Sequence, residues 1–143
     1  MLRLSAYYVI KEPGRDVRVE ELKLTCNTKT DDKECVKYYN EVLKPLVDNS
    51  GVRKHRIFDD IYMLCADDFN RIGDKHNFYM TIGISGVFVK GAVAFTRCKH
   101  TIDFGMISIG LEKEEADAIV ESFRVHEEDG EILFEPHMIQ WNL

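Results

Sequence analysis

The sequence predicts an α+β fold, in which a mostly antiparallel sheet carries two amphipathic helices in the order ββαββββαββ. Two observations support this prediction. Two segments repeat apolar residues at helical spacing, and several short apolar runs between them are separated by glycine-rich or polar turns. The chain has 143 residues and shows no repeat or linker, so we expect one domain over residues 1–143.

The first elements are a hairpin and a long helix. Residues 2–10 and 17–24 are strand-like, and the Pro-Gly pair at 13–14 favours a turn between them. A helix over 31–47 follows, capped by Thr30 or Asp31. Its apolar face is made by Cys35, Val36, Tyr39, Val42, Leu43, Leu46 and Val47. Pro45 should kink or loosen the last turn.

The middle of the chain is rich in strand-forming residues. Residues 52–58 form a strand or the approach to one, and a strand over 61–65 shows little alternation, which is typical of a strand covered on both faces. Further strands are expected over 78–84, 87–95 and 102–109. Glycines within these runs indicate bends or bulges.

A second helix and a hairpin complete the predicted fold. The helix over 111–124 buries a side that contains Ala116 and Ile119, and a turn at 127–130 leads into a final strand around 132–134. Pro136 predicts that this strand lies at a sheet edge. A homodimer through that C-terminal edge strand is therefore one possible assembly.

The negative charge is concentrated in the last quarter of the chain. The net charge is -6, and residues 112–143 hold ten acids against two bases. Glu114, Asp117 and Glu121 share one face of the second helix, and Glu127, Glu128 and Asp129 follow in the turn. A solvated surface explains such a pattern. The functional alternative is an anionic stripe that docks on a partner protein with a basic surface.

Residues 53–56 form a short basic segment, which could interact with the acidic residues of the last quarter. It lacks interleaved aromatic residues, so direct nucleic-acid binding is not favoured. We interpret it as the exposed side of a strand or as an internal partner of the acidic hairpin.

A glycine-rich segment at 83–91 supports an alternative function, the binding of a nucleotide or another small molecule. Exposed backbone there could approach a ligand, with polar side chains nearby in the sequence. The candidate ligand-binding residues are Asn70, Arg71, Asn77, Gly83, Ser85 and Gly86.

Two acidic pairs, Asp59–Asp60 and Asp67–Asp68, could hold Mg²⁺ in a nucleotide-processing enzyme. Adjacent residues on a strand point to opposite faces, however, so turn formation is the simpler interpretation. Phosphate-binding and hydrolase motifs are absent from the sequence. We assign no catalytic residue, metal or cofactor, and a non-enzymatic protein is favoured.

The four cysteines form no C-x-x-C pair, which favours free thiols in a reducing compartment. Cys35 and Cys65 have apolar neighbours and are expected in the core. A zinc site with Cys26, Cys98 and His100 matches no structural zinc pattern. The sequence has no membrane-length apolar run and no signal peptide at its start, so we expect a cytoplasmic protein without membrane contact.

Several features in order resemble a family of small uncharacterised proteins carried by phages, plasmids and conjugative elements of gut bacteria. These are the Glu-Pro-Gly turn at 12–14, the helix over 34–47 and the strand 60–68 with acidic pairs at its ends. Asn77 and the apolar strand 86–95 follow. The resemblance implies a mobile-element setting and no particular site residues. With the charge pattern, it leads us to expect an anti-defence inhibitor of a host defence or nucleic-acid-handling protein.

Overall fold

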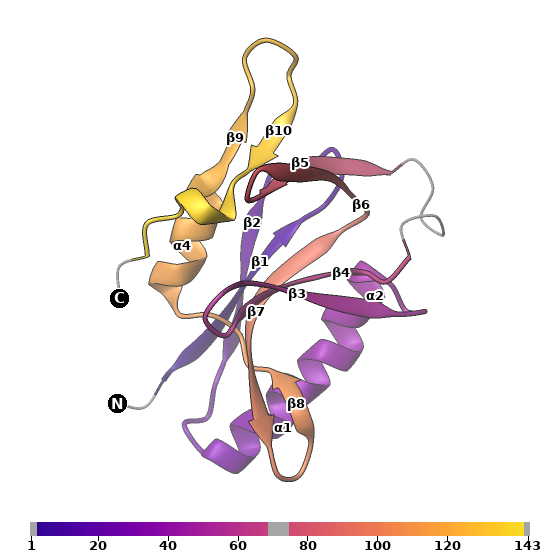
Figure 1. Ribbon diagram of the computed structural model, residues 1–143. Coiled ribbons are helices and arrows are strands. Elements are labelled where there is room, and N and C mark those ends of the chain that lie inside the picture. The colour runs from indigo at the N-terminus through magenta and orange to yellow at the C-terminus, as the bar shows by residue number, and fades with distance from the viewer. Residues whose placement is uncertain (1–2, 69–74, 142–143) are drawn as a thin grey trace.

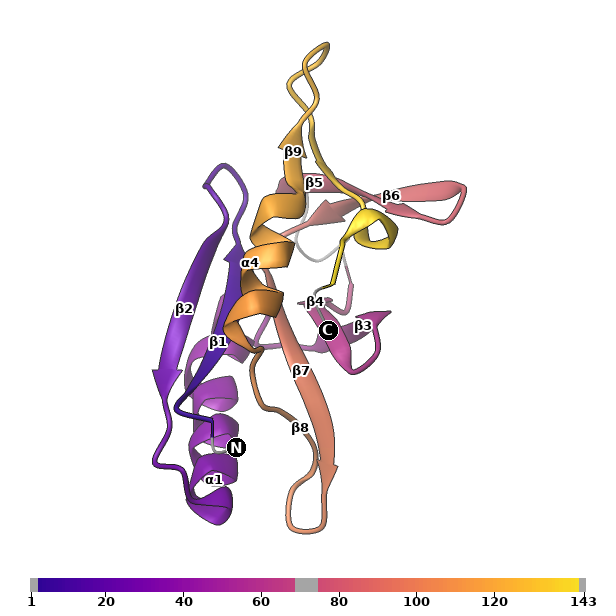
Figure 2. The same ribbon diagram turned by 90° about the vertical axis from the view of Figure 1, so that its left-hand side faces the viewer.

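The computed structural model describes residues 3–68 and 75–141. Their elements form three layers: a helical layer, a central antiparallel sheet, and a smaller second sheet that shares its layer with a C-terminal helix (Figures 1 and 2). The α+β class predicted from the sequence is therefore confirmed. Within these residues, each helix is too short or too polar to cross a membrane.

The central sheet has the strand order β2-β1-β7-β4-β3, and β8 pairs with β7 beyond this path. All of its pairings are antiparallel. The strands are β1 (Ser5–Lys11), β2 (Arg18–Lys23), β3 (Val52–Phe58), β4 (Ile61–Ala66), β7 (Val93–Thr101) and β8 (Gly105–Ser108).

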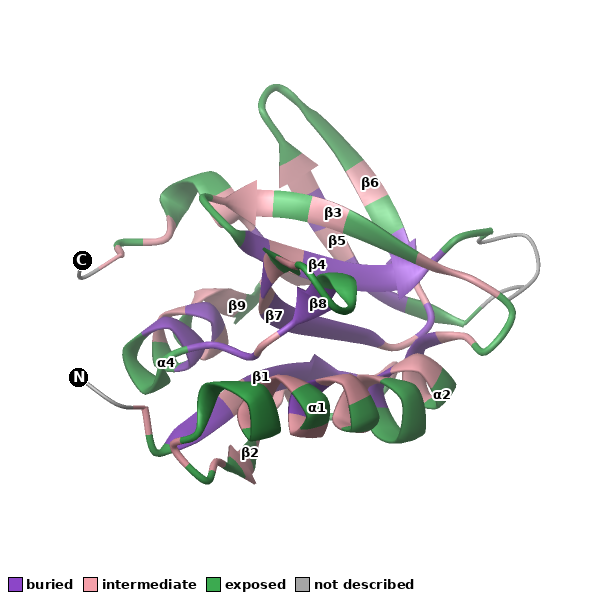
Figure 3. Ribbon diagram, turned by 90° about the horizontal axis from the view of Figure 1, so that it is seen from below, coloured by how far each residue is buried: buried purple, intermediate pink, exposed green. Residues whose placement is uncertain are grey.

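The alternation of side chains along β1 shows why the central sheet is covered on both faces. Ala6, Tyr8 and Ile10 belong to the core beneath the helical layer, whereas Val9 belongs to the core on the other face. Side chains alternate with a period of two along a strand, so one short apolar run supplies both cores. Figure 3 shows the buried central strands between the two covering layers.

The helical layer consists of α1 (Thr28–Tyr38), a π-helical turn (Tyr39–Leu43) and α2 (Lys44–Val47). The cap is Asn27, whose side-chain oxygen accepts a hydrogen bond from the Thr30 amide at 3.3 Å, so the expectation of a cap at Thr30 or Asp31 was wrong. The π turn lies directly before Pro45. It accommodates a residue that lacks an amide hydrogen, and it lies one turn before α2, the last turn, where the loosening was expected.

The second sheet has the order β6-β5-β10-β9. Its strands are β5 (His76–Ile82), β6 (Ser85–Lys90), β9 (Phe123–Val125) and β10 (Ile132–Phe134). The expectation that the last strand lies at an edge was wrong. β10 pairs in parallel with β5 and antiparallel with β9, so it has no free edge to offer a second copy. Pro136 lies beyond the strand and opens the 3₁₀ helix η2 (Pro136–Met138).

The predicted element order also needs correction. Six strands, rather than four, lie between the two helical regions among the described residues. The single strand expected over 87–95 is divided at Gly91, whose φ of 77° belongs to the left-handed region. The chain turns there and passes from the second sheet to the central sheet.

An aromatic cluster joins the second sheet to the C-terminal helix α4 (Lys113–Ser122). The Phe123 and Phe134 rings stack with their centroids 4.6 Å apart, and Phe78 and Phe95 meet them edge-on. Ala116 and Ile119 of α4 are fully buried in the same core. This packing fixes the orientation of α4 and of the β9–β10 hairpin that follows it.

Candidate functional site

The start of α4 is fixed by a capping box. The Glu112 side chain accepts a hydrogen bond from the backbone of the third helical residue, and the Glu112 amide donates to Glu115 Oε1 at 2.9 Å. The two residues thereby satisfy amides that a helix start leaves without partners. The helix register that follows determines which acids point to solvent.

Glu115 is the one acid of this helix that faces the core, where its exposed fraction is 5%. Arg97 of β7 donates from Nε to both Glu115 carboxylate oxygens, at 2.9 and 3.1 Å, and also contacts Asp59 at 3.3 Å. Hydrogen bonding to Glu115 raises the pKa of Arg97. The Arg97 cation is therefore used inside the fold and anchors the helix to the central sheet.

The acidic stripe, which we define as Glu114, Asp117 and Glu121, lies on the exposed side of α4. All three residues line a groove of about 430 Å³. The opposite wall comes from η2 and the residues after it, including Met138, which is 58% exposed. Arg124 also lines the groove. Figure 1 shows η2 beside α4.

The acidic stripe retains most of its negative charge. Asp117 pairs with Lys113 at 3.1 Å, an exposed contact of the kind that contributes little. Glu114 and Glu121 form no ion pair within the described residues.

The basic segment of β3 does not neutralise these acids. Arg56 lies 4.0 Å from Asp60, and no ion pair within the described residues joins Arg53 or Lys54 to an acid of the C-terminal region. Of the two interpretations of this segment, exposed strand residues are the one that agrees with the structure for Arg53, Lys54 and Arg56.

The remaining three candidates form a separate group, the acidic tip, made by Glu127, Glu128 and Asp129. They lie at the end of the β9–β10 hairpin, which projects from the body of the molecule (Figures 1 and 2). All three are exposed, and Asp129 contacts His126 at 3.3 Å. They do not line the α4 groove. The structure therefore divides the six predicted residues into two groups on one side of the fold.

The glycine-rich segment does not bring its predicted residues together. Gly83, Ser85 and Gly86 lie at the β5–β6 turn, whereas Asn77 lies near the opposite end of β5, roughly 20 Å away at the rise of a strand. A Cβ on Gly86 would lie 2.0 Å from the Tyr79 hydroxyl, so this glycine makes room for a ring of its own chain. Asn70 and Arg71 lie outside the described residues.

Asn77 is part of a buried hydrogen-bond network. Its amide nitrogen donates to the carbonyl oxygens of Lys11 and Gly91, both at 2.8 Å, and its oxygen accepts from Lys11 Nζ at 2.9 Å. Burial lowers the pKa of Lys11. These contacts join β1 to the second sheet. The sequence offered no signal for this network, because charged residues in strands are normally solvated.

The candidate metal-binding residues do not converge either. Asp59–Asp60 and Asp67–Asp68 lie at opposite ends of β4, roughly 23 Å apart at the rise of a strand. Asp59 has a φ of 50° in the turn and contacts Arg97. Cys98 is buried, whereas His100 is exposed. Across residues 3–68 and 75–141, no cluster of three His, Cys, Asp or Glu side chains is placed to hold a metal ion.

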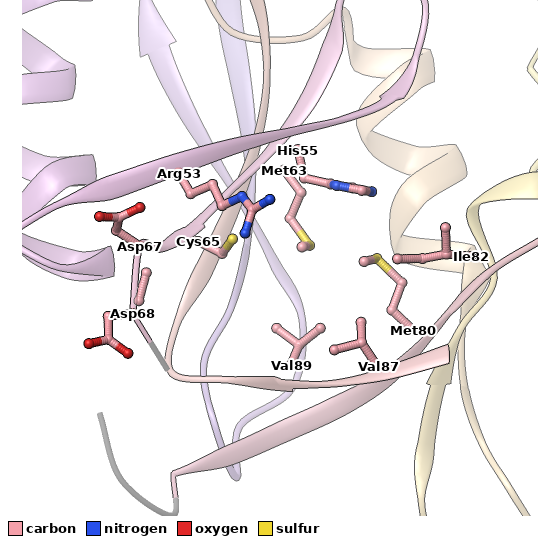
Figure 4. Close-up of a pocket in the computed structure, with 11 residues that line it drawn as sticks. Arg53, His55, Met63, Cys65, Asp67, Asp68, Met80, Ile82, Val87 and Val89 are labelled. Atoms are coloured by element: carbon pink, nitrogen blue, oxygen red, sulfur yellow. The ribbon is translucent and has the colours of Figure 1, made fainter. Parts of the chain in front are cut away.

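A pocket of about 400 Å³ lies between the two sheets, and we call it the inter-sheet pocket. Figure 4 shows its arrangement. Met63, Cys65, Met80 and Val89 form a buried apolar floor. The other lining residues are Arg53, His55, Ala66, Asp67, Asp68, Ile82 and Val87. The sequence pattern gave no sign of this pocket, because it forms where the β3–β4 and β5–β6 hairpins of different sheets meet.

The ionisable groups in the pocket are affected by its low polarity. Burial raises the pKa of the Cys65 thiol to about 11, and the Arg53 charge opposes this rise. Burial and the Arg53 charge both lower the pKa of His55. The core positions expected for Cys35 and Cys65 are confirmed, and all four thiols are free.

Comparisons of the chain with protein-family models, curated proteins and solved structures found no match. The resemblance to mobile-element proteins thus stays a prediction, and the functional argument rests on the geometry alone.

Proposed function

We propose that this chain is a non-enzymatic binding protein that docks through the α4 groove on a basic surface of a partner protein. One observation carries the proposal: the acidic stripe lines an open groove, and the basic segment of the same chain leaves it unneutralised. Like charges held close together oppose folding, so their solvation or a partner must compensate.

The two walls of the groove define the surface that would fit it. The three carboxylates of the acidic stripe are on the second, fifth and ninth residues of α4, which places them along one face of the helix. Met138 faces the same groove from η2 and is largely exposed. A matching surface therefore presents arginine or lysine residues beside an apolar side chain. The acidic tip extends the negative surface beyond the groove.

Proteins that handle nucleic acids expose basic surfaces of this kind, because they must neutralise phosphates. Occupation of such a surface by the acidic stripe would exclude the nucleic acid. This supports the more specific proposal of a phage- or plasmid-borne inhibitor of a host defence or nucleic-acid-handling protein. Electrostatic contacts of this type favour fast association and weaken as salt increases.

The test uses a fluorescein-labelled nona-arginine peptide and fluorescence anisotropy at about 0.1 M salt, where the Debye length is about 10 Å. We compare the double variant Glu114→Lys/Glu121→Lys with the control Glu34→Lys/Glu41→Lys. Both pairs are seven residues apart in helical segments, and both change the net charge equally. We expect at least a tenfold loss of affinity for the first variant and less than a twofold loss for the control.

Equal losses in the two variants would mean that the peptide responds to net charge and not to the groove. Unchanged binding in both variants would reject the acidic stripe as a docking surface. Circular dichroism of each variant verifies that the helices are retained.

A further inference from the structure

The inter-sheet pocket lies apart from the α4 groove and shares no lining residue with it. From its lining we infer that the inter-sheet pocket binds a small organic monoanion with an apolar body, whose charged group is held by Arg53. This function is additional to partner docking, and neither requires the other.

The apolar floor determines the body of the ligand. Met63, Met80 and Val89 are almost completely buried, and Val87 extends the same wall toward solvent. The two methionines are flexible and polarizable, so they can adapt to ligands of different shape. A volume of about 400 Å³ falls within the range of small-molecule sites. An aromatic or branched apolar group would fill it.

Arg53 supplies the charge. Its guanidinium extends into the pocket in Figure 4, above Cys65 and beside Met63. Its field reaches two other lining groups, because it affects the pKa of both Cys65 and His55. Arg53 forms no ion pair within the described residues. An exposed arginine beside an apolar floor is suited to a carboxylate or sulfonate on an apolar molecule.

The rim limits the charge of that ligand. The carboxylates of Asp67 and Asp68 lie at one side of the pocket and point away from Arg53 in Figure 4. Arg53 is the one arginine among the described residues of the lining and Asp67 lies at the same rim, with His55 neutral near pH 7 because its pKa is lowered. A polyphosphate brings several negative charges to a single arginine, whereas a monoanion can place its one charge at Arg53. A nucleotide is therefore disfavoured as the ligand.

Two dyes with the same ring system separate the apolar and charged contributions. 8-Anilinonaphthalene-1-sulfonate carries one sulfonate, and N-phenyl-1-naphthylamine is its uncharged counterpart. We expect both dyes to bind the folded protein with increased fluorescence. Arg53→Gln should weaken binding of the sulfonate about five- to tenfold and change binding of the neutral dye less than twofold.

The control variant is Lys54→Gln, which removes an equal charge from the next residue of β3. Lys54 lines a different cavity, on the α1 side of the sheet, so it should change the binding of neither dye. A second variant, Val87→Trp, fills the pocket from its half-buried wall and should weaken both dyes at least tenfold. Circular dichroism and the thermal midpoint verify that each variant is folded.

Several outcomes would overturn the inference. A folded protein that binds neither dye would reject the pocket as a binding site. Unchanged affinities in Val87→Trp would show that the dyes bind elsewhere. Equal effects of Arg53→Gln and Lys54→Gln would remove the role of Arg53. Displacement of the sulfonate dye by ATP would contradict the monoanion assignment. None of these results depends on the α4 groove, so the two proposals succeed or fail separately.

Discussion

The α4 groove and the inter-sheet pocket differ in how they hold charge. The groove carries three carboxylates on one exposed helix face, and solvent reaches each of them. The pocket places one arginine beside an apolar floor that four strands build together. A charge on an exposed helix keeps its water and has little effect on the free energy of folding. A charge buried in an apolar floor would lose that water, which is unfavourable. Arg53 is itself exposed, so water solvates its charge while its side chain lies beside the buried floor.

Loss of the Arg97–Glu115 pair gives the largest expected change in stability. This pair distinguishes the buried acid of α4 from the exposed acids of the same helix. Replacement of Arg97 by methionine leaves the Glu115 carboxylate buried without its partner. We expect the free energy of unfolding to fall by about 3–5 kcal/mol, as for other broken buried pairs. Urea denaturation followed by circular dichroism measures the change.

The matched control is Glu114→Gln, which alters the neighbouring but exposed acid of the same helix turn. Its expected effect is within about 1 kcal/mol, because an exposed acid near a helix start contributes little more than that. The combination of Arg97→Met with Glu115→Gln should recover part of the loss, since no buried charge remains. Similar effects of the Arg97 and Glu114 variants would contradict this division of the acids.

The Cys65 thiol tests the low polarity of the inter-sheet pocket. Its pKa is about 11 in the folded protein and about 9 in an unfolded chain. The stabilisation is fully present below pH 9 and is lost as the pH rises toward 11, because the unfolded chain releases the proton first. The loss amounts to roughly 3 kcal/mol.

The Cys65→Ala variant lacks this contribution. Between pH 9 and 11, the free energy of unfolding of the variant should therefore fall less than that of the wild type. Urea midpoints measured at several pH values give the two curves. Buried Cys35 and Cys98 remain in both proteins, so the difference isolates Cys65. Parallel curves would show that the pocket floor is more polar than the structure indicates.

The elements that follow from local sequence pattern were predicted well. The apolar periodicity located the first helix, which spans residues 28–47, and the second, which spans 113–122. The acidic stripe was found for the same reason, because positions three and seven residues apart share a helix face. The sequence could not show which helix acid faces the core, since Glu115 is distinguished only by its distant partner Arg97.

The features that depend on long-range pairing were missed. Pro136 favoured an edge strand, yet the chain places β10 between β5 and β9, and the proline comes after the strand. The division of 87–95 at Gly91 and the Lys11–Asn77 network likewise require knowledge of which strands meet. The inter-sheet pocket belongs to this group. Its lining residues have no common spacing in the sequence.

The central claim is that the acidic stripe, and not negative charge in general, receives a basic partner. The most direct measurement is a titration of the ¹⁵N-labelled protein with the nona-arginine peptide, followed by amide chemical shifts. At 16.6 kDa, the chain is suited to this method. We predict that the largest shifts occur in α4 and in residues 136–140. Shifts of similar size at the acids of α1 and β2, with none concentrated at the α4 groove, would contradict the account.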